Sequence, residues 1–62
     1  MTLKEERWAE ALAVERLHGP SAPVHVAERV GALALAGDLA GVERWREIGF
    51  HLDRLMRRRE PR

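Results

Sequence analysis

The residues that could carry out chemistry gather in one short segment of the first half of the chain. Ser21 is the only serine, and His18 and His25 lie close to it on either side. A serine beside a histidine is the arrangement of a nucleophile with its general base. Ser21, however, stands where a helix would begin, and a helical chain of this size is not expected to enclose the ~300 Å³ usual for a ligand site. We therefore expect no catalytic residues and no enzymatic activity.

Metal binding is the second chemistry to weigh. His25 and Glu28 are three residues apart and would share one face of a helix, a spacing that metal sites in helical bundles use together with ligands from further helices. Glu15 and His18 are the nearest additional candidates, and the chain has no cysteine. Such spacings are common by chance. We expect His18 to lie near the last carbonyls of a helix and His25 to be solvated, and we predict neither a metal nor a cofactor.

The elements that would position these residues are all helical. Alternating apolar and polar residues are absent, and good helix formers dominate the composition. Gly37 can end a helix in the left-handed conformation, and Asp38 can accept hydrogen bonds from the free N–H groups of the next one. Residues 1–62 are therefore predicted to form one all-α domain, a small three-helix bundle with an αα-hairpin at Gly37-Asp38. The predicted helices span about 3–17, 22–36 and 39–58.

Capping residues support the other two helix boundaries. Thr2 followed by Glu5 is the pattern of a capping box at the start of the first helix. Gly19 would end that helix, and Ser21 would cap the second one.

The third helix carries the clearest apolar face. Its apolar residues recur at intervals of three and four, as in a helix that packs on a core. We expect small residues of the second helix to lie opposite Trp45, and we expect His51 to be a solvated neighbour of Glu47. The stripe comprises Val42, Trp45, Ile48, Gly49, Leu52, Leu55 and Met56, and the small residues are Ala27, Gly31 and Ala34.

Apolar surface is left over in this arrangement. The third helix is longer than the second, so its last apolar residues should project beyond the hairpin, where a second subunit or an obliquely crossing first helix could cover them. Phe50 falls on the polar side of its helix and is a candidate anchor for a protein contact. We predict a homodimer, with an unidentified protein partner also possible, that acts as a small adaptor or interaction module. The predicted interaction residues are Trp8, Leu12, Phe50, Leu55 and Met56.

Charge gives the alternative function. The net charge is +1, so no overall field attracts nucleic acid or acidic lipid. Arginines nevertheless gather at the end of the third helix, and the alternative hypothesis is a weak nucleic-acid-binding protein that uses Arg54, Arg57, Arg58 and Arg59. No apolar run approaches the ~20 residues of a membrane span, and the chain does not begin like a secretory signal. We expect a cytoplasmic protein without membrane contact.

The chain resembles a family of short, uncharacterised bacterial helical proteins. The resemblance covers residues 5–55. It is carried by residues 27–48, AERVGALALAGDLAGVERWREI, which fit the pattern AER[IV]GALAxxGDxxGVxxWxxI. The opening ERWA of residues 6–9, His18-Gly19 and Ala22-Pro23 also resemble that family. The resemblance implies a compact helical unit and implies no catalytic residue, substrate or partner. Phe50 and the arginine-rich end lie outside its motif.

Overall fold

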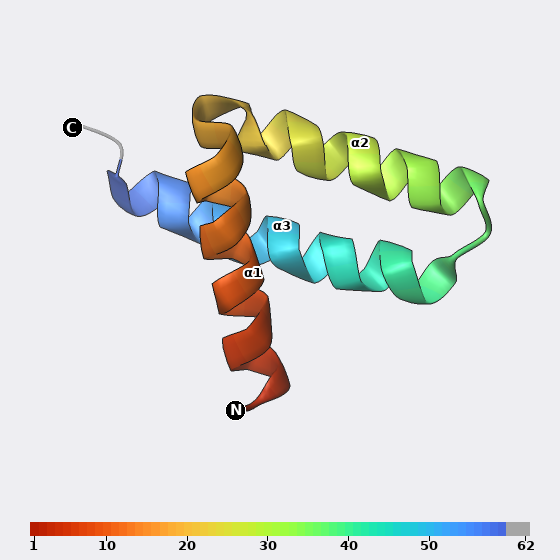
Figure 1. Cartoon of the computed structure of the whole chain (residues 1–62), viewed down its shortest axis with the longest axis horizontal. Helices are drawn as coiled ribbons and strands as arrows, with labels where there is room; N and C mark the ends of the chain where they lie inside the picture. Colours follow the sequence, from red (N-terminus) through yellow and green to blue (C-terminus); the bar gives the residue numbers. More distant parts are fainter. Residues whose placement is uncertain (60–62) are drawn as a thin grey trace.

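The computed structural model describes residues 1–59, and helices account for nearly all of them (Figure 1). They are α1 (Leu3–His18), a short 3₁₀ turn (Gly19–Ser21), α2 (Ala22–Leu35) and α3 (Leu39–Arg59). No strand occurs in this part of the chain. The all-α prediction is confirmed, and the predicted helix boundaries agree closely with the observed ones. Residues 60–62 of the predicted domain lie outside the described part.

The helices are arranged as a hairpin with a crossing helix. Figure 1 shows α2 and α3 side by side and antiparallel, while α1 runs across the C-terminal half of α3. This differs from a clear three-helix bundle, in which α1 would lie along the other two helices. The end of the hairpin that contains Gly37 extends away from α1.

The hairpin turn follows from two residues. Gly37 has a φ of 73°, which L side chains rarely adopt. The N–H of Asp38 donates to the carbonyl of Leu33 at 3.0 Å and the N–H of Gly37 donates to that of Ala34 at 3.1 Å, the Schellman pattern. Oδ1 of Asp38 then accepts from the N–H of Gly41 at 2.9 Å. The predictions that Gly37 ends α2 and that Asp38 caps α3 are both confirmed.

The cap of α1 is also as predicted, but the cap of α2 is not, although α2 begins at the predicted residue. Thr2 and Glu5 form the reciprocal capping box, with N···O distances of 3.1 and 3.2 Å. Ser21, by contrast, makes no capping hydrogen bond within the described residues, so its predicted role was wrong. Gly19 has a φ of 56°, and the chain enters α2 through the 3₁₀ turn that contains Pro20.

The core lies where the three helices meet. Ala11 of α1 is fully buried there, and its small side chain allows α1 to lie close to the other helices. Ile48 and Leu52 are the largest fully buried side chains. The complete core comprises Ala11, Ala22, Val26, Ile48, Leu52 and Leu55, with Trp8, Val14, Val30, Trp45 and Met56 packed against it.

The face of α2 that contacts α3 is not the predicted one. The small residues expected opposite Trp45 are exposed, namely Ala27, Gly31 and Ala34. Val26 is buried instead, because a branched side chain removes more apolar surface from water than glycine or alanine does. Trp45 contacts polar neighbours: Arg29 lies over its ring at 5.3 Å, and His25 meets its edge at 5.7 Å.

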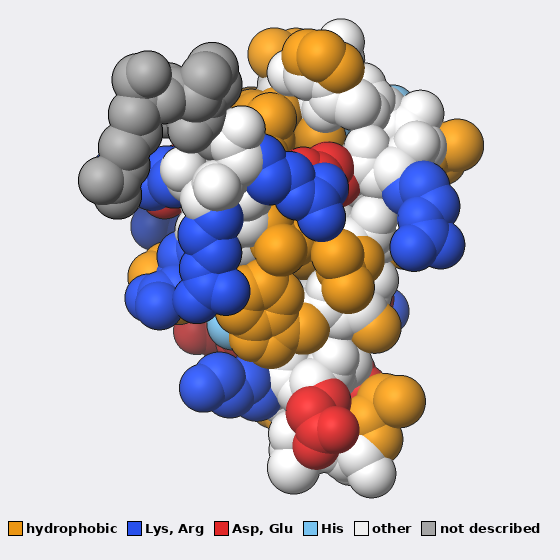
Figure 2. Space-filling model, turned by 90° about the vertical axis from the view of Figure 1, so that its left-hand side faces the viewer, with side chains coloured by type: hydrophobic (Ala, Val, Ile, Leu, Met, Phe, Trp, Pro, Cys, Tyr) orange, Lys and Arg blue, Asp and Glu red, His pale blue; other side chains and the backbone are white. Residues whose placement is uncertain are grey.

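The apolar end of α3 is covered within one chain. Leu55 is only 9% exposed, and Met56 packs against the core. Of the two alternatives for these residues, the structure therefore shows the one in which the first helix crosses obliquely. Hydrophobic side chains still gather in the middle of the face seen from the C-terminal end of α3, with Lys and Arg side chains beside them (Figure 2).

Candidate interaction surface

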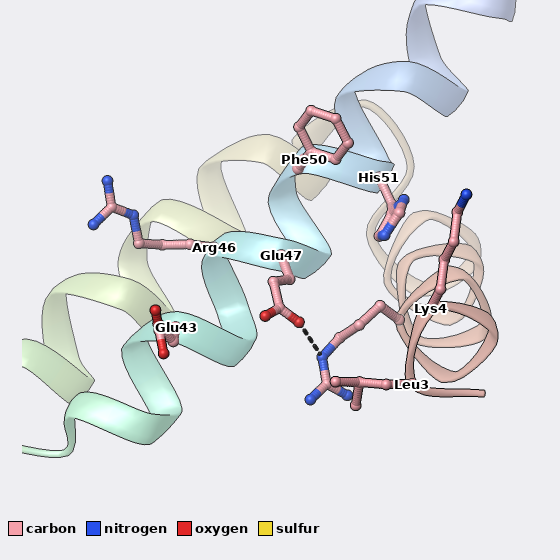
Figure 3. A pocket seen from close by; sticks show the side chains of 8 residues that line it. Leu3, Lys4, Glu43, Arg46, Glu47, Phe50 and His51 are labelled. Atoms are coloured by element: carbon pink, nitrogen blue, oxygen red, sulfur yellow. Dashed lines mark hydrogen bonds and ion pairs between the residues drawn. The ribbon is translucent and has the colours of Figure 1, made fainter.

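A groove runs between the N-terminal half of α1 and the middle of α3 (Figure 3). It is open to solvent and has a volume of about 530 Å³. Three basic residues, two acidic ones, two exposed apolar ones and a histidine line it: Leu3, Lys4, Arg7, Glu43, Arg46, Glu47, Phe50 and His51. Two further open grooves of about 430 and 610 Å³ flank the end of α3. All three are open surface grooves, whereas the expectation from the sequence concerned an enclosed cavity.

Arg7 and Glu47, which line the groove, belong to an ion-pair network that joins α1 to α3. Nη1 of Arg7 lies 2.7 Å from Glu10, and its Nε lies 3.0 Å from Glu47 on α3. Arg44 of α3 completes the network at 2.8 Å from the second oxygen of Glu10. The Arg7 side chain is only 14% exposed, so water screens these pairs less than it screens ordinary surface ion pairs. The network holds the two helices at a defined separation.

Another part of the groove is aromatic. Phe50 is 59% exposed, with Arg54 over its ring at 5.7 Å. Its edge meets the ring of His51 at 5.5 Å, and His51 in turn lies 4.9 Å from Trp8 of α1. Phe50 thus ends a row of three rings that runs from the half-buried Trp8 through the buried His51 to the surface. A rigid, exposed aromatic side chain of this kind is a typical anchor at protein interfaces.

His51 is a functional candidate that the sequence analysis missed. It is buried, not solvated, and its Nδ1 has no hydrogen-bond partner in the part of the chain that the structure describes. Its position could have revealed this, because residue 51 lies three positions after Ile48 and four before Leu55, on the core side of α3. A buried polar atom without a partner lowers stability.

The histidines and serine near the first turn do not assemble into a reactive site. The rings of His18 and His25 stack at 3.8 Å, and His25 is half-buried, so its predicted solvation was wrong. Ser21 is exposed at the turn. No group of three or more potential ligands is placed to hold a metal ion among residues 1–59.

The predicted interaction residues are placed very differently from one another. Phe50 and Leu12 are exposed, whereas Trp8 and Met56 are half-buried against the core, and Leu55 is buried. Leu12 and Met56 line the groove of about 430 Å³ beside the C-terminal part of α3. Leu12 and Phe50 are therefore accessible to a partner, and Trp8 and Met56 are partly accessible. Leu55 is part of the core of the single chain.

The arginines of the nucleic-acid alternative are partly engaged. Nε of Arg57 lies 2.8 Å from Asp53, and Arg59 forms an ion pair with Glu15 of α1. Arg54 lies over Phe50, and Arg58 is exposed. Carboxylates thus neutralise two of the four cations that were predicted to contact phosphates.

The family of the chain can now be stated. Residues 3–60 match the model of a family of unknown function, DUF6961. The chain belongs to this family. The DUF6961 match spans α1, α2 and α3. Neither a curated protein nor a solved structure matches the chain. Within the described part of this DUF6961 protein, no helix is both long enough and apolar enough to cross a membrane.

Proposed function

We propose that this DUF6961 protein is a small, non-catalytic interaction module that self-associates, as a homodimer, through apolar helix faces. The observation that supports this proposal is the large surface of the single chain. Its accessible area is 4776 Å² for a mass of 7.1 kDa. Compact monomers of that mass expose about 4,100 Å². The chain therefore exposes more surface than a compact monomer of its mass, and this surface is available to a partner.

The composition of the exposed surface supports the same proposal. Large apolar side chains are exposed on all three helices: Leu3, Leu12, Leu17, Val24, Leu35, Leu39 and Phe50, together with Met1. A small domain without disulfides commonly gains stability by oligomerisation. In the groove between α1 and α3, Phe50 and Leu3 could receive an apolar side chain of a further protein partner, while Lys4 and Arg46 could bind a nearby carboxylate.

We also propose that the protein is cytoplasmic and bacterial, and that the pattern AER[IV]GALAxxGDxxGVxxWxxI marks its family. In this pattern GD corresponds to the hairpin turn, and the glycine of GV corresponds to Gly41, whose N–H is capped by Asp38. A structural role for these positions accounts for the motif without any catalytic function.

The alternative, weak nucleic-acid binding by Arg54, Arg57, Arg58 and Arg59, has less support because Asp53 and Glu15 pair with two of these residues. The two hypotheses respond differently to salt. Phosphate contacts weaken steeply as counterions compete, whereas association through apolar burial tolerates salt.

The deciding experiment is sedimentation velocity over a range of protein concentrations in 0.5 M salt. We expect the mass of a dimer at high micromolar concentration, and a monomer throughout that range would contradict the proposal. Labelled RNA and single-stranded DNA at low salt test the alternative. A shift of either one that disappears in 0.5 M salt, together with a monomeric mass, would favour nucleic-acid binding.

A further inference from the structure

His51 is a buried polar residue that lines the groove between α1 and α3. It is only 9% exposed, and its Nδ1 is enclosed without a hydrogen-bond partner among residues 1–59. Nδ1 alone of the two ring nitrogens is enclosed in this way, which leaves Nε2 as the nitrogen that can reach the groove.

The surroundings of Nδ1 determine what Nε2 offers to the groove. In a neutral imidazole one nitrogen carries the proton and donates, while the other accepts. Buried N–H groups without an acceptor are rarer in proteins than buried acceptors without a donor, so the proton of a neutral ring belongs on Nε2. In a charged ring both nitrogens donate. In either form, His51 presents an N–H donor to the groove.

Two cations stand at the same end of the groove as His51. Lys4 lies one helical turn before Trp8 on the same face of α1, and the ring of Trp8 is 4.9 Å from that of His51. Arg54 follows His51 by one turn of α3 and lies over the ring of Phe50. Neither cation forms an ion pair within the part of the chain that the structure describes. Figure 3 shows the His51 ring pointing from α3 towards α1, with Lys4 beside it.

The carboxylates that line the groove are either paired or distant from this end. Glu47 lies 3.0 Å from Nε of Arg7, which neutralises it. Glu43 precedes His51 by more than two turns of α3, or about 12 Å along the helix axis. Figure 3 shows these two side chains well apart along α3. The end of the groove at His51 therefore combines hydrogen-bond donors with positive charge, and it is complementary to a carboxylate.

We propose that the groove binds an acidic segment of another protein, with a carboxylate of that segment between Lys4 and Nε2 of His51. A neighbouring apolar side chain of the segment would lie on Phe50 and Leu3, which are 59% and 58% exposed. Exposed aromatic side chains are typical anchors at protein interfaces. This inference rests on the proposed role as an interaction module and specifies the partner of its groove.

Two other occupants suit the groove less well. The groove is open to solvent, whereas pockets for small molecules bury most of their ligand. Nucleic acid presents a continuous row of phosphates, and Glu43 and Glu47 would both face that row. A protein segment can place one carboxylate at the His51 end and keep its acidic groups away from Glu43.

Selection from a display library of random linear peptides tests the inference. We expect the natural chain to enrich peptides in which Asp or Glu stands next to a large apolar residue. Failure to enrich such peptides would overturn the inference. Enrichment of peptides that are apolar but not acidic would do the same, because Lys4 and His51 would then have no part in binding.

Charge variants show whether the enriched peptides bind at the proposed place. Lys4→Glu should weaken their binding about 10-fold or more in fluorescence anisotropy, because it brings like charges together. Lys4 is exposed in the first turn of α1, where a carboxylate is favourable to the helix dipole, so the fold should be retained. Arg16→Glu is the matched control: it makes the same charge change at an exposed position of α1 that lines a different groove, and binding should be unchanged. Equal effects of the two variants would overturn the inference.

His51→Leu tests the donor separately from the stability of the fold. It removes the N–H of Nε2 and places an apolar side chain in the core, so the chain should not lose stability. Binding of the enriched peptides should nevertheless weaken several-fold. Undiminished binding to this variant would contradict the role of His51.

Sedimentation velocity separates this inference from the proposed self-association. Lys4→Glu should leave the dimer intact. If Lys4→Glu dissociates the dimer, a second copy occupies the groove, so this inference fails and the self-association stands. A monomeric natural chain that enriches acidic peptides would overturn the self-association and support the inference. Binding of single-stranded RNA that Lys4→Glu abolishes, without enrichment of acidic peptides, would identify nucleic acid as the occupant.

Discussion

Cγ1 of Val26 lies 3.1 Å from the point that a β-carbon on Gly49 would occupy. This is a close approach between α2 and α3 in which the glycine has a packing function. Replacing glycine by alanine inside a helix normally stabilises it by about 0.8–1 kcal/mol. At Gly49, the added methyl group would force Val26 to shift by a few tenths of an ångström within the packed core. Overpacking costs about 1–3 kcal/mol.

The first prediction compares two glycines. Gly31→Ala should raise the free energy of unfolding by about 0.5–1 kcal/mol in dilute solution, because its site is open and helical. Gly49→Ala should not raise it and should lower it by about 1 kcal/mol. Urea denaturation at low micromolar protein concentration measures both. Equal stabilisation by the two variants would show that α2 and α3 are farther apart than described.

The second prediction concerns the cap of α3. Asp38→Ala removes the acceptor of the Gly41 N–H and should lower the free energy of unfolding by about 1 kcal/mol. Asp38→Asn keeps a side-chain oxygen in the same place and should lose only a few tenths of that value. Thermal denaturation followed by circular dichroism is sufficient, since 1 kcal/mol shifts the midpoint of a domain of this size by about 4–8 °C. Equal losses in both variants would indicate a role for the negative charge instead of the cap.

The third prediction concerns the ion pairs that join α1 to α3. Arg7→Ala should lower the free energy of unfolding by about 1–2 kcal/mol, because it removes two ion pairs and the packing of a half-buried side chain. Arg57→Ala is the control: its pair with Asp53 is solvent-exposed and four residues apart on one helix, so the loss should be about 0.5 kcal/mol or less. Urea denaturation in 0.1 M salt compares them. If Arg57→Ala lowered the free energy of unfolding more than Arg7→Ala does, the ion pairs between α1 and α3 would not be what holds α1 in place.

The fourth prediction concerns the unpartnered nitrogen of His51. His51→Leu replaces a buried, unsatisfied ring with an apolar side chain and should raise the free energy of unfolding by up to about 1 kcal/mol. His51→Ala should lower it by about 2 kcal/mol or more, because it leaves a cavity beside Trp8. Urea denaturation of the natural chain and of both variants in the same buffer measures these differences. A loss of stability in the leucine variant would indicate that an ordered water molecule satisfies Nδ1.

Local signals predicted the helices well, because each depends on neighbouring residues. The capping box at Thr2 and the Gly37-Asp38 turn are confirmed, since both are patterns of hydrogen bonds within four or five positions. Ser21 was a wrong prediction because the preceding residues, Gly19 and Pro20, form a 3₁₀ turn that changes how the chain enters α2. Local patterns could not reveal the angle at which α1 crosses.

The candidate site was harder to predict because it depends on that angle. The groove between α1 and α3 places Arg7 beside Glu47, which is 40 positions away in the sequence. The rotation of α2 was also missed: Ala27, Gly31 and Ala34 were expected inside, but Ala22 and Val26 are buried instead. When a helix is apolar on both sides, the hydrophobic pattern alone does not determine which side faces the core.

The full burial of Ala11 where the helices cross has a consequence for the groove as well as for the core. Helix α1 crosses α3 near Ala11, so a change in the crossing angle there would move the N-terminal end of α1 relative to α3. A larger side chain at position 11 would tilt the N-terminal half of α1. It would thereby change the distance between Leu3 and Phe50 without replacing either residue. Relatives could therefore acquire wider or narrower grooves, and different binding preferences, through a single substitution at a residue that no ligand touches.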